Sequence, residues 1–198
     1  HGADPSYDNF AAIKAAAVGT HGNFSRPYYT DGRTQADYFR VLDQLAADTD
    51  RITDIHGVAL RAAAAADNDD MLAYLASRGA DIHLDSEAAL IAASSCFAIT
   101  AVEWLLARGA DVRACNDAAL IAAVTALDSS TAEVLLDAGA DIHVDDELPL
   151  RTALTTNPRH LYSCESDLSV PRSHMISLLT SRGADVRHLA VTQLAAIA

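Results

Sequence analysis

The chain has 198 residues, enough for one ordinary domain or one short repeat array. Its 27 acidic residues against 14 Lys and Arg give a formal net charge of −13, which disfavours nucleic-acid phosphates and anionic lipids as partners, because like charges repel before contact. Apolar residues make up 51% of the chain, which excludes a disordered polyelectrolyte, and its longest apolar run, 118–124, is far shorter than the roughly 20 residues that cross a bilayer.

The first expected elements lie in residues 2–47. The sequence GADPSYDNFAAIKAA predicts a helix that ends near Val18, and the apolar spacing from Tyr38 to Leu45 predicts a second helix. The stretch 19–35 between them contains three glycines and a proline, so we expect a loop insertion there. Residues 48–78 follow as a second unit, in which GVALRAAA places Leu60 in the role that Ile13 has in the first.

Four further units open with the same tripeptide. Gly-Ala-Asp recurs at Gly79, Gly109, Gly139 and Gly183, at spacings of 30, 30 and 44 residues, and a leucine follows each glycine after 11 residues. Within a unit, apolar residues at helical spacing predict two helices, and the next glycine ends the second one because it adopts a left-handed conformation without steric cost. The predicted units are therefore helical hairpins over 79–108, 109–138, 139–182 and a partial 183–198.

A second insertion explains the longer spacing of the fifth unit. Residues 155–172 contain two prolines and interrupt the helical pattern, so we expect a loop there. Exposed tyrosines of the two insertions, Tyr28, Tyr29 and Tyr162, are suited to contact a partner, or they fold back onto the neighbouring helices.

These units resemble the ankyrin repeat, in its short form of about 30 residues, in which Gly-Ala-Asp-Ile/Val is followed by an Ala-Leu-x-x-Ala-Ala helix and a Leu-Leu helix. The resemblance covers nearly the whole chain, although the usual Thr-Pro-Leu-His helix start is reduced to sequences such as Glu87-Ala88-Ala89-Leu90. It implies an all-α fold: a single ankyrin-type helical-hairpin solenoid over residues 1–198, with two insertions. The loops between units are about three residues shorter than in the common form, so we expect tight turns instead of long β-hairpins.

Neither end of the sequence reads as a polar cap. Because solenoid units bury their faces only against neighbours, we expect the array to continue into further repeats or to associate end to end.

The histidines and acidic clusters are the residues to consider as metal ligands. His83 and His143 occupy the same position two units apart, which is too far for shared ligation, so we expect polar residues at the tips of the units. The acidic runs Asp67 to Asp70 and Asp145 to Glu147 lack the glycine and glutamate of a calcium loop, and they read as turn formers and helix N-caps. We predict no metal and no cofactor.

The cysteines are the residues to consider as nucleophiles. Cys164 lies near His160 and His174 in sequence, a pairing that can activate a thiolate, but no flanking motif supports catalysis. Cys96 and Cys115 sit in or beside apolar helical sequences and are expected to be inert. Three cysteines without a CxxC pair favour a reducing compartment such as the cytoplasm, and delivery into a host cell stays open. We predict that the chain is not an enzyme.

The leading functional hypothesis is a scaffold that binds a partner protein with a basic surface through its concave face and repeat tips. The alternatives are an accessory or regulatory region of a larger enzyme, effector or toxin, and a structural subunit of an assembly. Aligned with the family, the expected contact residues are His83, Asp85, Ile91, Arg113, Asn116, Ile121, His143, Asp145, Asp146 and Arg151.

Overall fold

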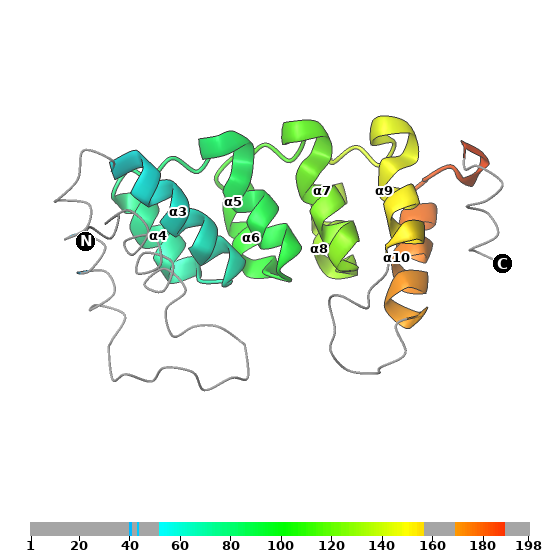
Figure 1. Ribbon diagram of the computed structural model, residues 1–198, viewed down its shortest axis with the longest axis horizontal. Helices are drawn as coiled ribbons and strands as arrows, with labels where there is room; N and C mark the ends of the chain where they lie inside the picture. The colour runs from blue at the N-terminus through cyan, green and yellow to red at the C-terminus, as the bar shows by residue number, and fades with distance from the viewer. Residues whose placement is uncertain (1–39, 41–42, 44–51, 157–168, 189–198) are drawn as a thin grey trace, which may run out of the picture.

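The computed structural model describes residues 40, 43, 52–156 and 169–188 (Figure 1). These residues form eight α-helices and one 3-10 helix: α3 Ile52–Ala65, α4 Asp69–Ser77, α5 Leu84–Ser95, α6 Ile99–Leu106, α7 Ala114–Ala126, α8 Ser129–Asp137, α9 Val144–Thr155, α10 Ser169–Ser181 and η2 Val186–His188. No strand occurs among the described residues, which confirms the all-α fold and the tight turns. The insertion expected at 19–35, most of the first unit and the helix expected at the chain end lie outside them.

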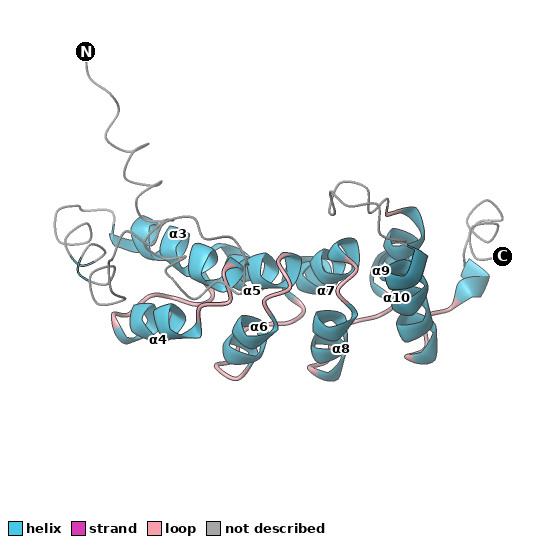
Figure 2. Ribbon diagram, turned by 90° about the horizontal axis from the view of Figure 1, so that it is seen from below, coloured by secondary structure: helices cyan, strands magenta, loops and turns pink. Residues whose placement is uncertain are grey.

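The helices form two parallel rows (Figure 2). The first helices of successive units, α3, α5, α7 and α9, contact one another in sequence, and the second helices, α4, α6, α8 and α10, form the other row. Each first helix also packs on the second helix of its own unit. Contacts therefore run between neighbours along the array, as expected of a solenoid.

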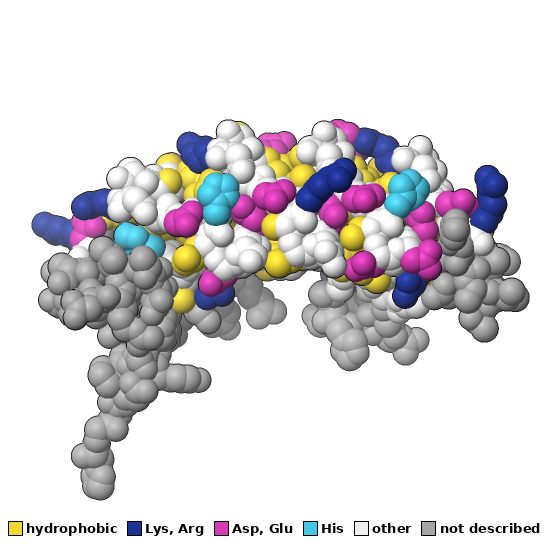
Figure 3. Space-filling view, turned by 90° about the horizontal axis from the view of Figure 1, so that it is seen from above, with side chains coloured by type: hydrophobic (Ala, Val, Ile, Leu, Met, Phe, Trp, Pro, Cys, Tyr) yellow, Lys and Arg dark blue, Asp and Glu magenta, His cyan; other side chains and the backbone are white. Residues whose placement is uncertain are grey.

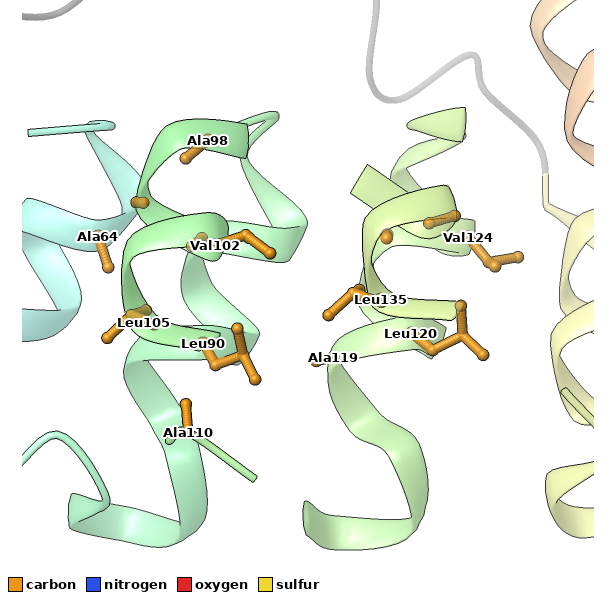
Figure 4. Close-up of a cluster of buried hydrophobic side chains, with 14 of the residues drawn as sticks. Ala64, Leu90, Ala98, Val102, Leu105, Ala110, Ala119, Leu120, Val124 and Leu135 are labelled. Atoms are coloured by element: carbon orange, nitrogen blue, oxygen red, sulfur yellow. The ribbon is translucent and has the colours of Figure 1, made fainter. Parts of the chain in front are cut away.

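The hydrophobic core lies between the two rows (Figure 4). The leucine that follows each Gly-Ala-Asp glycine by 11 residues is fully buried in the described units, and alanines three residues further along accompany it. Each second helix contributes a buried leucine four residues before its glycine. The largest fully buried side chains are Leu60, Met71, Leu72, Leu75, Leu90, Leu105, Leu120, Leu135, Leu150, Met175 and Leu179. Small alanines let the helices approach closely while these larger side chains fill the space between them.

The Gly-Ala-Asp glycines end the second helices as the sequence predicts. Gly109 has φ of +92° and Gly139 has φ of +100°, a region that favours glycine. After Gly109, the Ala110 amide donates to the Leu105 carbonyl at 3.2 Å, and the Gly109 amide donates to the Leu106 carbonyl at 3.0 Å, which is the bonding of a Schellman cap. Space does not impose glycine here, because an added Cβ would meet nothing within 4 Å at either position.

A left-handed turn opens the first helix of three units, which the sequence pattern did not predict. Three consecutive non-glycine residues have positive φ in each: Asp85 to Glu87 in α5, Cys115 to Asp117 in α7 and Asp145 to Glu147 in α9. The expectation that Asp145 to Glu147 act as helix N-caps is therefore wrong, since they form this turn and the N-cap residue His143 makes no side-chain cap hydrogen bond. The turn also explains how Pro149 lies within α9, because the right-handed segment begins only after Glu147 and proline is tolerated in a first turn.

The second insertion is shorter than predicted. Helix α9 continues to Thr155 and α10 begins at Ser169, so the ends of the expected 155–172 loop are helical. Pro171 did not prevent this because it lies in the first turn of α10, where no intrahelical donor is lost.

Candidate functional site

The aspartates of the Gly-Ala-Asp motif stabilise the turns between units. The carboxylates of Asp81, Asp111 and Asp141 each accept a hydrogen bond of 2.9 Å from the backbone amide two residues later, and that of Asp185 accepts an equivalent bond of 2.8 Å. Such turns fix the chain direction after each glycine. The carboxylates of these four aspartates therefore accept hydrogen bonds within the array, and they contribute less to binding of a partner than their number suggests.

Histidine and glutamate form a close pair at two of the tips. The Nδ1 atom of His83 lies 2.5 Å from the Oε1 atom of Glu87, and His143 and Glu147 show the same distance. The imidazoles are about half exposed, whereas the glutamate side chains are only 5% and 6% exposed. The hydrogen bond to the glutamate raises the pKa of each histidine above its ordinary value of 6.5.

The intervening tip uses arginine and aspartate at the same two positions. Arg113 donates from Nε to the carbonyl oxygen of Gly139 at 2.8 Å, and the buried carboxylate of Asp117 accepts from the amide of Asp141 at 2.7 Å. Burial raises the pKa of Asp117 above its ordinary value, although the bond from Asp141 and the charge of Arg113 act against that rise.

The predicted contact residues divide into two groups. Seven lie at the tips and are exposed: His83, Asp85, Arg113, Asn116, His143, Asp145 and Asp146. Figure 3, which faces the tips, shows histidine, carboxylate and arginine side chains along this edge of the array. Asp85 also lies 3.6 Å from the guanidinium of Arg61 in the previous unit.

The other three predicted contact residues lie on the first helices. Ile91 and Ile121 are half-buried and face partly away from the core. Arg151, at the equivalent position of α9, bends back to its own left-handed turn and donates to the carbonyl oxygens of Asp145 and Asp146 at 3.3 Å. The ten residues therefore come from the tips and the first-helix row of the array.

The second-helix row carries aromatic and charged contacts. Tyr74 and Trp104 pack against the core, and the guanidinium of Arg108 lies over the Trp104 ring at 3.5 Å from its centre. Arg182 bridges Glu133 and Asp137 of the previous unit at 2.8 and 2.5 Å. The ion pairs of Arg182 therefore join neighbouring second helices.

One groove of about 260 Å³ lies between α8 and α10. At its edge the Nδ1 atom of His174 is 3.2 Å from the hydroxyl of Ser129. The nearby carboxylate of Glu133 is bound to Arg182, so it does not orient the imidazole as an acid does in a hydrolase triad.

The described part of the chain shows neither a cluster of metal ligands nor a membrane span. There, no group of three or more His, Cys, Asp and Glu side chains is arranged to hold a metal ion. None of its helices combines the length and apolar character needed to pass through a bilayer. Cys115 is exposed and Cys96 half-buried, and neither forms a disulfide; Cys164 and His160 lie outside the described residues.

Sequence reasoning missed the pairing of tip residues four apart. The repeat places His83 and His143 at equivalent positions, but it does not assign the acid that faces each of them. The signal was present as an acidic residue 8 positions after three of the Gly-Ala-Asp glycines, at Glu87, Asp117 and Glu147. Helical spacing alone does not reveal it, because the left-handed turn lies between the partners.

This arrangement defines the class of protein: a solenoid of helical hairpins, each closed by a glycine and stacked on its neighbours. A family model of ankyrin repeats, in three copies, matches residues 60–146. Residues 60–146 therefore consist of ankyrin repeats. Ankyrin repeats are in general modules for protein–protein interaction and are typically non-catalytic. No curated protein matches the sequence.

Proposed function

We propose that this chain binds a partner protein through the surface formed by its tips and first helices, and that the partner presents a basic surface to the tips. The observation that carries the proposal is the exposure of Asp85, Asp145 and Asp146 in the left-handed turns, where the backbone holds them outside the core. The half-buried Ile91 and Ile121 supply apolar contact area beside them.

The charge at the tips supports a basic partner because the net charge of the chain is −13 and acidic groups steer oppositely charged surfaces during encounter. The aspartates of the Gly-Ala-Asp motif already accept hydrogen bonds within the turns. We therefore assign the negative charge that attracts a basic partner to the left-handed turns of α5 and α9. The α7 turn, Cys115 to Asp117, exposes a thiol and an amide at the corresponding places.

The test is capture of a partner by the full chain, followed by charge reversal. We expect Asp145→Arg combined with Asp146→Arg to weaken binding of the captured protein and to reduce its dependence on ionic strength. The matched control is Glu103→Arg with Glu133→Arg, which makes the same charge change on the second-helix row. Equal binding by the tip variant and the wild type, or equal losses in the two variants, would contradict the proposal.

A further inference from the structure

At two of the tips, the acidic residue connects its unit to the next. The amide of Asp111 donates to Glu87 Oε1 at 3.1 Å, and the amide of Asp141 donates to Asp117 Oδ1 at 2.7 Å. In both cases the acceptor lies in one unit and the donor opens the following one. These buried carboxylates therefore hold successive turns together.

A basic residue four positions earlier accompanies each of these acids. The three pairs, which we call fasteners, are His83 with Glu87, Arg113 with Asp117 and His143 with Glu147. In the two histidine fasteners the second carboxylate oxygen, Oε2, is buried and has no hydrogen-bond partner. A buried carboxylate in such surroundings costs free energy unless a cation lies close to it.

The two kinds of fastener differ in whether the positive charge of the basic side chain depends on pH. Arginine stays charged at all physiological pH values, whereas histidine gains and loses its proton near neutrality. We infer that His83–Glu87 and His143–Glu147 are proton-dependent fasteners, which strengthen the stacking of neighbouring units when the imidazole is protonated and weaken it when the proton leaves. The arginine fastener between them keeps its cation throughout.

The charges around the histidines agree with this inference. His83 is surrounded by Glu87, Asp81 and Asp111, and all three raise its pKa, opposed only by desolvation. For His143 the corresponding groups are Glu147, Asp141 and Asp185, the last of which lies in the turn after α10.

The raised pKa fixes the direction of the effect. Because the folded histidine binds its proton more tightly than the unfolded one, its contribution to stability is fully present below pH 6.5 and is lost as the pH rises through the folded pKa. The array should therefore stack more firmly in mildly acidic than in mildly alkaline solution.

The amides of Asp111 and Asp141 provide matched reporters within one molecule. We would measure their hydrogen-exchange protection by NMR on the full chain from about pH 6 to about pH 8.5, which spans the histidine range, with each rate corrected for intrinsic exchange. The Asp111 amide reports the His83–Glu87 fastener and should lose about fivefold of its protection across this range, the population change that one typical hydrogen bond supports. The Asp141 amide reports the arginine fastener and should keep its protection.

Two variants test whether the pH dependence of protection comes from protonation of His83. His83→Arg copies the arginine fastener, so the Asp111 amide should keep its protection at every pH. His83→Gln keeps a neutral donor, so this amide should show the low, alkaline level of protection throughout. Parallel behaviour of the Asp111 and Asp141 amides in the wild type would overturn the inference, as would an unchanged pH dependence in His83→Arg. The wild-type comparison decides the matter even where a variant folds poorly.

Discussion

Helix α6 begins without a side-chain cap of its own, and a residue of the preceding unit takes that role. Its N-cap residue is Ala98, whereas the equivalent residues Asn68 and Asp128 cap α4 and α8 with their own side chains. In α6 the carboxylate of Asp67 accepts from the Ala101 amide at 2.8 Å and from the Thr100 hydroxyl at 2.6 Å. The cap thus joins two units.

We predict that Asp67→Gly destabilises the array by about 1 kcal/mol, within the range of about 0.5 to 2 kcal/mol that loss of an N-cap costs. Glycine is the suitable replacement because Asp67 has φ of +55°, so the change removes the carboxylate without introducing backbone strain. The loss should fall on the junction between α4 and α6, because the cap crosses it.

The assay is urea denaturation of the full chain in a double-mutant cycle with Ala98→Asn. Asparagine at this position restores the local cap that Asn68 provides in α4, so it should recover about 1 kcal/mol when Asp67 is replaced and gain less in the wild type. Asp67→Asn is the control, because it keeps an acceptor and tolerates positive φ, and should lose less than Asp67→Gly. An equal effect of Ala98→Asn in both backgrounds would refute the reasoning, since it would mean that the two caps do not share a donor.

Three further outcomes are expected from the same measurement. Gly109→Ala should cost about 1 kcal/mol because φ is +92° while the site has room for a methyl group, and an unchanged stability would show that the turn can relax. Leu120→Ala should cost about 2 to 5 kcal/mol, since this fully buried side chain lies between two units, and a smaller loss would mean that the neighbours collapse into the cavity. Asp117→Asn should stabilise the protein at pH 7, because it keeps an acceptor for the Asp141 amide and removes a buried charge whose pKa is raised. That gain should shrink as the pH falls through the raised pKa of the folded carboxyl towards 3.8, its ordinary value. A loss of stability at pH 7 would mean that the charge is a net benefit.

Much of the fold could be predicted because the information is local and repeated. The leucine at a fixed distance from each glycine, the alanines beside it and the glycine itself each have one physical role, and recurrence makes the pattern unambiguous. The second helices between Asn68 and Gly139 follow from this pattern alone. The positions of the tip residues also followed, because equivalent residues of a solenoid repeat along one edge.

The partners of those tip residues could not be predicted. Which acid lies near His83 depends on the left-handed turn of α5, and that conformation is unusual for aspartate, serine and glutamate. Likewise, the cap of α6 comes from Asp67, more than thirty residues earlier in the chain, so no local rule assigns it. These contacts exist only once neighbouring units have stacked.

The sequence by itself therefore determined the repeat, the helices, the glycine stops and the residues that reach the edge of the array, because periodic burial and backbone preference act over a few residues. Only the tertiary structure decided which aspartates are committed to turns, which carboxylates are buried and which basic group faces each of them. The reason is physical: the burial and pairing of a charge depend on side chains brought together across the junctions between units, and that arrangement is set by the stacking of whole helices.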